Sequence, residues 1–477
     1  MKARLFAPEN RKWWTLGAVS IGLFMIMLDN TVVNVALPSM QRALHIGPNE
    51  LEWVVVGYAL SFATFMLTGG KLADLFGRRL LFVVGLAIFT ATSLACGLAP
   101  NAGFQIGARV VQGVGAAIMN PATLGIITAT FPPRQRGTAI GIWAGTSALA
   151  LAIGPLVGGV LTEKVDWSWI FYINVPVGIA GIAMAFWAID ESRDTSHEQR
   201  LDLPGLVTSA AAFFALTYGL IEANNYGWTS PRILALFAAF VVLLAVFIVL
   251  ESRQRLPMLD LALFRDVTFS GANVAMLLVT LAMFGIFFYN SLFIQNILGY
   301  SAIQTGAIFL PMTVLIILIA PRAGKLTDSI GARWLVGGGL GLVAISLVLF
   351  AQLDRGSNFW NILPGLLVGG VGMALTMTPT TAAAMGSVPV DKAGVGSAVL
   401  NSSRQIGGSL GIAVMGAIVA SHVHASRQSP LFADQFVSGY HQALYAAAGI
   451  ALAGAIVAVA TVRKVEHDVP VPALDLA

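Results

Sequence analysis

Two charged residues interrupt stretches of the sequence that are long and apolar enough to cross a membrane. Asp29 follows Trp13–Leu28, which contains no charge, and Arg109 lies inside the apolar stretch 104–130. A charge in a bilayer interior costs at least about 2.5 kcal/mol on insertion scales, so such residues usually face a cavity and serve function. A carboxylate can bind and release a proton, and a guanidinium at the same depth can neutralise it.

The two residues are expected to lie at similar depth in the membrane. Asp29 precedes the expected helix end at Leu37 by eight residues, about 12 Å, and Arg109 lies about 8 Å from the start of its helix at residue 104. Two alternatives are that Asp29 reaches surface water and that Arg109 snorkels to the outer interface. Asn34, five residues beyond Asp29, joins them as a candidate for proton coupling or substrate binding.

A second arginine, Arg404, lies about ten residues into the apolar stretch 394–420, close to the expected midplane. Snorkelling is less plausible at that depth, so a cavity or a contact between parts of the protein is favoured. Arg404 is therefore a further candidate for proton coupling or substrate binding. The nearby glycines Gly407, Gly408 and Gly411 allow another helix to approach closely.

The composition indicates an integral membrane protein. Of 477 residues, 57% are hydrophobic and 10% are charged, whereas soluble domains carry roughly 25% charged residues. The net charge of +4 comes from basic residues scattered over short loops, which report membrane orientation rather than binding of nucleic acid. The single cysteine, Cys96, excludes an intrachain disulfide.

The hydropathy pattern predicts an all-α fold with fourteen membrane-spanning helices. A span needs about 20 apolar residues. If the N-terminus is cytoplasmic, twenty lysines and arginines fall on the cytoplasmic side and five outside, so we expect a cell (inner) membrane protein with both termini in the cytoplasm. The expected spans are 13–37, 51–69, 80–99, 104–130, 138–162, 168–189, 204–223, 233–250, 268–296, 303–322, 334–352, 359–385, 394–420 and 440–462.

An internal repeat divides these helices into two units. "GKLADLFGRRLLFVVG" from Gly70 and "GKLTDSIGARWLVGGG" from Gly324 share eight residues at a lag of 254, and "QGVGAAIMNP" resembles "GGVGMALTMTP" at a lag of 257 to 258. Parallel repeats of six spans with a site between them at the midplane are the architecture of major facilitator transporters. The predicted parts are a first bundle at 1–190, a linker with two inserted helices at 191–266, a second bundle at 267–463 and a tail at 464–477.

Two further motifs are candidates for conformational roles. The short "GKLADLFGRR" connection requires a sharp turn at Gly77, and Asp74 can accept from helix N-terminal amides or from an arginine. The repeat favours a shared structural role, a gate latch, over a substrate site. In "GPLVGG" (154–159), a proline bends the helix and glycines permit tight packing.

These motifs together resemble the major facilitator superfamily and, more narrowly, its 14-helix drug:proton antiporter family. The similar stretches are "LDNTVVNVALP" (28–38), "GKLADLFGRR" (70–79), "RVVQGVGAA" (109–117), "GPLVGG" (154–159), "WSWIFYINVPVGI" (167–179) and "RQIGGSLG" (404–411). Leu75 and Ala150 depart from the family pattern, which often has a basic residue and a glycine at these positions.

The resemblance implies proton-driven export of amphipathic compounds by alternating access. Asp29 is then a proton- or cation-binding acid and Arg109 the residue tied to proton coupling. The gate latch is expected to comprise Gly70, Asp74, Gly77, Arg78, Asp328 and Arg333. The antiporter hinge is expected to comprise Gly154, Pro155, Gly158 and Gly159.

Other functions are disfavoured or remain as alternatives. No lysine is followed by the serine or threonine of a phosphate loop, which argues against an ATP-driven pump. No hydrolase motif suggests a membrane enzyme. A metabolite symporter or facilitator of the same superfamily is the alternative. We expect protons, lipid and a small amphipathic substrate as partners, with no cofactor, metal or nucleic acid, and a functional monomer. The substrate's charge is left open.

Overall fold

The structure is a computed structural model, and it describes residues 10–45, 48–193, 202–254, 257, 259–423 and 431–463. Each of the fourteen stretches predicted to cross the membrane is helical. In the described residues, twelve helical segments are long and apolar enough to span a bilayer. The remaining two predicted spans fall on α6 and α11, which have 32 and 30 residues.

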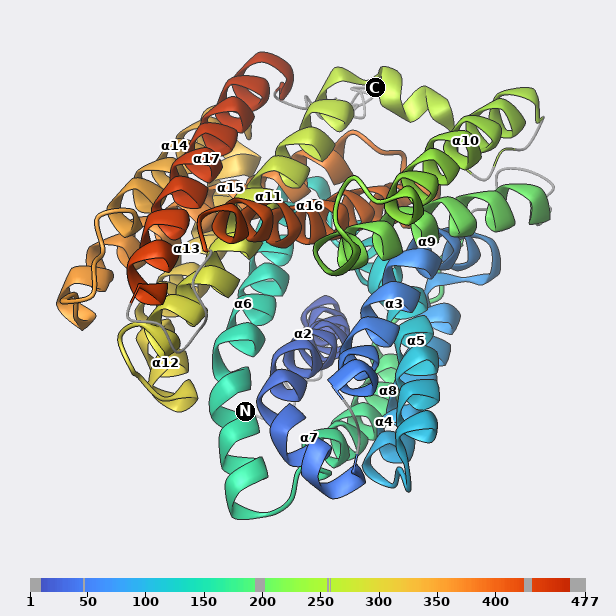
Figure 1. Cartoon of the computed structure of the whole chain (residues 1–477). Helices are drawn as coiled ribbons and strands as arrows, with labels where there is room; N and C mark the ends of the chain where they lie inside the picture. The colour runs from blue at the N-terminus through green and yellow to red at the C-terminus, as the bar shows by residue number, and fades with distance from the viewer. Residues whose placement is uncertain are drawn as a thin grey trace, which may run out of the picture.

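The first six predicted spans form one group of helices (Figure 1). Asn101 begins one of them, because its side chain accepts a hydrogen bond from the backbone N–H of Phe104. The sixth span is broken at Ile173 into a short and a longer helix. The elements are α2 (Arg11–Leu44), α3 (Pro48–Phe76), α4 (Arg78–Gly97), α5 (Ala102–Thr130), α6 (Pro133–Lys164), α7 (Trp169–Tyr172) and α8 (Asn174–Ala188).

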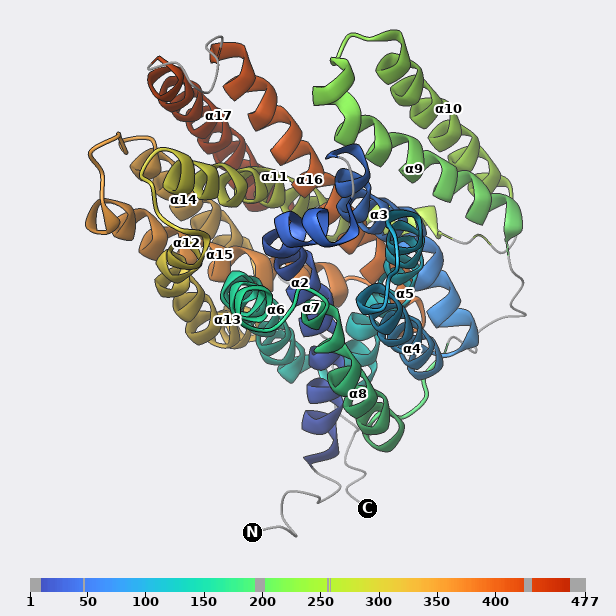
Figure 2. The ribbon, with the colours of Figure 1, turned by 60° about the horizontal axis from the view of Figure 1, so that its bottom comes forward.

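The last six predicted spans form a second group, which lies beside the first (Figures 1 and 2). Its second span begins with a capping box at Ser301 and is divided at Phe309, where Pro311 starts the longer helix. The elements are η2 (Leu261–Arg265), α11 (Val267–Asn296), α12 (Ala302–Ile308), α13 (Leu310–Ile330), α14 (Arg333–Phe350), α15 (Phe359–Gly386), η3 (Val390–Lys392), α16 (Ala393–His422) and α17 (Phe432–Thr461).

Two helices, α9 (Leu203–Tyr226) and α10 (Pro231–Arg253), lie between the groups in sequence and at the edge of the molecule in space (Figure 2). α9 packs on α3 and α16, whereas α10 packs mainly on α9. Only 11% of the most apolar part of α10 is buried. A helix that is apolar all round and so little covered by protein is suited to contact lipid.

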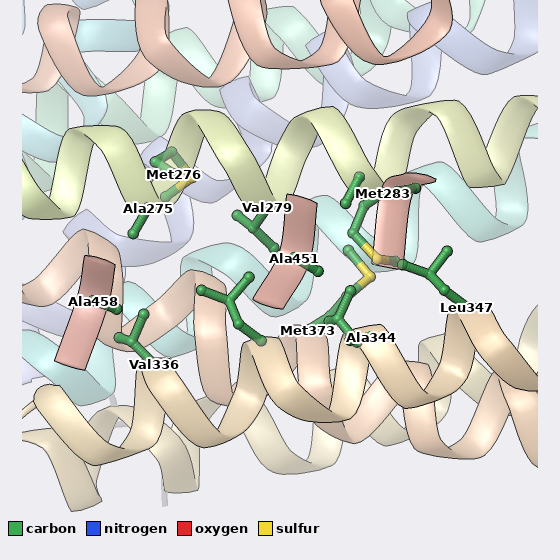
Figure 3. Close-up of a cluster of buried hydrophobic side chains, with 14 of the residues drawn as sticks. Ala275, Met276, Val279, Met283, Val336, Ala344, Leu347, Met373, Ala451 and Ala458 are labelled. Carbon is green, nitrogen blue, oxygen red and sulfur yellow. The ribbon is translucent and has the colours of Figure 1, made fainter. Parts of the chain in front are cut away.

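Each group has its own apolar core. Figure 3 shows part of the second core, where Met283 of α11 lies near Leu347 of α14 and Met373 of α15. The first core is built around α2, α4 and α5. The two groups meet chiefly where α6 packs on α13 and α15, and where α16 packs on α3 and α5. The groups are called the N-half and the C-half below.

The predicted helix ends were less accurate than the predicted helices. α2 continues to Leu44 rather than ending near Leu37. Hydropathy marks the apolar part of a helix, but the backbone hydrogen bonds continue into the polar flank, so the apolar pattern alone ends the helix too early.

Candidate functional site

Asp29 of α2 and Arg109 of α5 form an ion pair inside the N-half. Arg109 Nη1 lies 2.5 Å from Asp29 Oδ2. The residues are 2% and 1% exposed, respectively. The structure therefore brings together the two charges that the sequence placed at similar depth. It also contradicts the alternatives in which Asp29 reaches surface water and Arg109 snorkels to the interface.

The protein satisfies most of the hydrogen-bonding capacity of this pair. Arg109 also donates to Gln112 Oε1 at 2.7 Å and to the Val54 carbonyl at 3.0 Å. Gln112 Nε2 donates to Asp29 Oδ1 at 3.3 Å and to Ser93 Oγ at 2.7 Å. A buried ion pair needs such additional hydrogen bonds to offset the loss of hydration.

An aromatic ring covers the guanidinium. The Arg109 Cζ lies 4.2 Å from the centroid of the Tyr58 ring, which favours the cation further. Sequence reasoning missed Tyr58, Val54, Ser93 and Gln112 as parts of the site. The spacing of Gln112, three residues after Arg109, places both on one helix face and is the signal that was available.

Asp29 lies further from the end of its helix than the sequence indicated. Fifteen residues of α2 follow Asp29, which corresponds to about 22 Å of helix rather than the expected 12 Å. Asn34 lies in the same helix, but its side chain is outside the described part of the chain.

Arg404 of α16 lies where the two halves meet. Its Cζ is 5.8 Å from the ring centroid of Trp143, which belongs to α6 in the N-half. Of the two readings that the sequence left for Arg404, the structure supports a contact between the halves. Gly407 and Gly411 allow α16 to pack closely on α11 within the C-half, because a Cβ on either glycine would collide with the backbone of α11.

Asp74 and Arg78 form a second buried ion pair, at the end of the molecule where α3 turns into α4. Arg78 Nη2 lies 2.7 Å from Asp74 Oδ1. Asp74 also accepts from the backbone N–H groups of Gly394 and Val395, at 2.9 and 2.8 Å. These amides belong to the first turn of α16, a natural site for a carboxylate. Because α16 is in the C-half, Asp74 joins the halves.

Arg78 strengthens the same contact. It donates to the carbonyls of Val390 and Asp391, at 2.6 and 3.1 Å. The residues Asp74, Arg78, Val390, Asp391, Gly394 and Val395 are called the Asp74 latch below. Gly77 makes the turn with φ = 114°, a conformation that favours glycine. A Cβ on Gly70 would stand 2.6 Å from the Gly394 carbonyl oxygen, so only glycine permits this approach.

The repeat has a matching contact, called the Asp328 latch below. Asp328 Oδ1 accepts from the backbone N–H of Gly137, the fifth residue of α6, at 3.2 Å. Gly137 and Gly394 are 257 positions apart, which matches the lag of 257 to 258 in the second stretch of the sequence repeat. A Cβ on Gly324 would collide with the Gly137 backbone. Each half therefore presents an acid to a helix N-terminus of the other half.

The structure does not bring Arg333 to Asp328. Arg333 is exposed and its guanidinium lies 5.2 Å from the ring centroid of Trp334. In the repeat it corresponds to Arg79, whereas the position that corresponds to Arg78 is occupied by Ala332.

The predicted hinge glycines line the packed faces of α6. A Cβ on Gly154 would overlap the hydroxyl of Thr31 on α2, and one on Gly159 would lie 3.0 Å from Ile303 of α12. Gly158 is also buried, and the side chain of Pro155 is outside the described part of the chain. α6 thus contacts α2 in its own half and α12 in the other.

Known proteins are similar to this chain in sequence and in fold. The Major Facilitator Superfamily model matches residues 19–412. Multidrug resistance protein Stp of Mycobacterium tuberculosis is 37% identical over 418 residues, covering 87% of this chain and 78% of that protein. The tetracenomycin C resistance and export protein of Streptomyces glaucescens is 34% identical, covering 97% of this chain and 94% of that protein.

A third relative and a solved structure agree with this assignment. The puromycin resistance protein pur8 of Streptomyces alboniger is 34% identical, covering 94% of this chain and 91% of that protein. The crystal structure of the human organic anion transporter MFSD10 (TETRAN) superposes with a TM-score of 0.69 at 14% identity, covering 94% of this chain and 99% of that one. That likeness is one of fold. The chain is therefore a multi-span membrane transporter that belongs to the major facilitator superfamily.

Proposed function

We propose that this protein is a proton-coupled antiporter of the 14-helix drug:proton type, which exports drugs or other amphipathic compounds. The names of the relatives support export, because each is described by resistance to multiple drugs, tetracenomycin C or puromycin. The fourteen helical stretches and the peripheral α9–α10 pair support the 14-helix type, with two six-helix bundles at 1–190 and 267–463.

The charge distribution supports an orientation with both termini in the cytoplasm of a cell membrane. Twenty of the lysines and arginines outside the spans belong to the side that carries the termini and both latches, and five to the other side. In that orientation the latches close the cytoplasmic ends of the halves. Export then requires the latches to open for substrate entry and to close again for release outside.

The observation that carries proton coupling is the buried Asp29–Arg109 pair. It lies within the N-half, and its hydrogen-bond partners Gln112 and Val54 belong to the same half. When a proton binds Asp29, Arg109 loses its counter-charge and the contact between the two side chains weakens. Movement of α2 or α5 then follows from protonation, and α2 packs on α6, which contacts the C-half.

The test is proton movement in proteoliposomes that contain a pH-sensitive dye. A panel of cationic, neutral and anionic compounds first identifies a transported probe. Adding that probe should then move protons in the opposite direction. Asp29→Asn should reduce this proton movement and uphill export at least tenfold, because the amide keeps the shape but cannot titrate. Asp190→Asn, which removes an exposed acid of the same half, should leave both unchanged.

The outcomes separate the antiporter from its alternative. Proton movement in the same direction as the substrate would identify a metabolite symporter, and transport without proton movement would identify a facilitator. If Asp29→Asn exchanges protons for substrate at the wild-type rate, Asp29 is not the coupling residue. Arg109→Ala should also impair coupling, since Asp29 would lose its stabilising counter-charge.

A further inference from the structure

Arg404 differs from Arg78 and Arg109, which are paired with acids, in having a charge that no described residue balances. In the part of the chain that the structure describes, its side chain has no hydrogen-bond or ion-pair partner. Its guanidinium carbon lies 5.8 Å from the ring centroid of Trp143, a cation–π contact. A guanidinium has five N–H donors, and leaving them unpaired in a membrane interior is costly. The group must therefore face water or a ligand.

The position of this pair is that of a substrate site. Arg404 is eleven residues into α16 and Trp143 ten residues into α6. Both lie about 15 Å from the latch end, which is half of a bilayer core. They project from opposite halves, and transporters of this architecture bind their substrates between the halves at that depth.

Trp143 adds a second unsatisfied donor at the same place. The residue is 2% exposed, and its indole Nε1 has no hydrogen-bond partner in the described residues. An indole N–H can only donate, so it too requires an acceptor. Two donors and a flat aromatic face suit a ligand that has an acidic oxygen on a flat apolar body.

The other charges of the spans do not compensate Arg404. Asp29 is already paired with Arg109 within the N-half. Asp74 and Asp328 lie at the latch end, where they accept from backbone amides of the opposite half. In the described part of the chain, no ion pair compensates this positive charge at mid-depth between the halves, and such a charge attracts anions and disfavours cations.

We propose that Arg404 and Trp143 bind the acidic group of the substrate, and that the transporter prefers anionic aromatic compounds, such as carboxylates and phenolates, over cations. This inference rests on the proposed export function and names the class of its substrate. It has an electrical consequence. Exchange of a monoanion for inward-moving protons transfers one more charge than exchange of a neutral compound, so membrane voltage should accelerate export of the anion more.

Three probes with one aromatic body test the proposal: 1-naphthoate, its neutral amide 1-naphthamide, and the cation 1-naphthylmethylammonium. Equilibrium binding to the purified protein, without any gradient, should be tightest for 1-naphthoate by about tenfold or more, the usual value of a charge-assisted hydrogen bond. Arg404→Gln should remove this preference by weakening 1-naphthoate alone. Arg404→Lys should retain part of it, and Trp143→Phe should weaken 1-naphthoate less than Arg404→Gln does.

Arg355→Gln is the matched control, because Arg355 is a partly exposed arginine of the C-half that is paired with Asp434. It should not change the order of the three probes. Equal weakening of all probes by Arg404→Gln, tighter binding of the cation, or no binding of any probe to the wild-type protein would overturn the proposal. Because binding is measured without a proton gradient or a membrane voltage, its result is independent of whether Asp29→Asn abolishes coupling.

Discussion

Asp74 and Asp328 occupy equivalent positions in the two halves, yet their surroundings differ. Both accept from backbone amides at the start of a helix in the opposite half. Asp74 is 3% exposed and has Arg78 beside it, whereas Asp328 is half-buried and has Ala332 at the equivalent position. One latch is a buried ion pair with backbone contacts, and the other is a backbone contact alone.

This difference shows which features both latches share and which belong to the Asp74 latch alone. The glycine, the acid and the helix N-terminus are present twice, so they suffice to bring the halves together. The arginine is present once, and it adds contacts to Val390 and Asp391. We therefore expect the two latches to contribute unequally to closure.

The largest effect is expected for Asp74→Asn. This change leaves the buried Arg78 without its counter-charge, and breaking a buried pair in this way costs about 3–5 kcal/mol. The latch end should open. Spin labels at Leu80→Cys and Trp334→Cys, two exposed and equivalent positions of the halves, report the separation in a Cys96→Ala background. The distance distribution should shift to longer values.

Asp328→Asn should open the same end much less. The amide oxygen still accepts from Gly137, so the loss is that of one charge-assisted contact, on the order of 1 kcal/mol. The same spin-label pair should show a minor open population. An equal or larger shift than that of Asp74→Asn would contradict the inequality of the latches. Asp354→Asn, an exposed acid, serves as the control.

The smallest effect is expected for a contact beside the Asp74 latch. Lys392 Nζ lies 2.7 Å from Asp260 Oδ2, and the equivalent of Lys392 in the repeat is Gln135, which accepts from Lys12. The hydrogen bond from Lys392 lowers the pKa of the Asp260 carboxyl. A lowered pKa stabilises the folded protein above the unfolded value of ~3.9, and this stability is lost as pH falls through the folded pKa.

Lys392→Gln should therefore lower the melting temperature slightly at pH 7, corresponding to less than about 1 kcal/mol for so exposed a pair. At pH 3 the wild-type protein and the variant should melt closer together. A difference that is the same at both pH values would show that Asp260 is not the partner that matters. Arg463→Gln provides a comparison at another position of the same side.

The helices and the two latch acids, Asp74 and Asp328, could be predicted from the sequence. A run of apolar residues marks each helix, and the internal repeat relates the two acids. Hydropathy located all fourteen stretches, and the lag of 254 located Asp328 from Asp74. The same lag did not justify including Arg333, since the repeat aligns it with Arg79 rather than Arg78. The residue type of Arg333 matches that of Arg78, but its position in the repeat does not.

The aromatic residues that contact the arginines from other helices could not be predicted from the sequence in this way. Depth alone suggested that Asp29 and Arg109 meet, but nothing in the sequence indicates that Tyr58 covers the guanidinium, since aromatic residues occur throughout the spans. Trp143 likewise lies in another half from Arg404, and only the packing of α16 and α6 against their neighbours brings the two together.

The latches receive their acids on main-chain amides, and this decides which changes the closing contacts tolerate. Any residue except proline at position 395 presents the same N–H, so the hydrogen bond to Asp74 does not depend on the side chain there. The direction in which these amides point, in contrast, depends on the length of the preceding segment. One residue inserted between Gly386 and Ala393 can turn the start of the helix by about 100° and direct its free amides away from Asp74. For this part of the chain, length is under stricter constraint than composition.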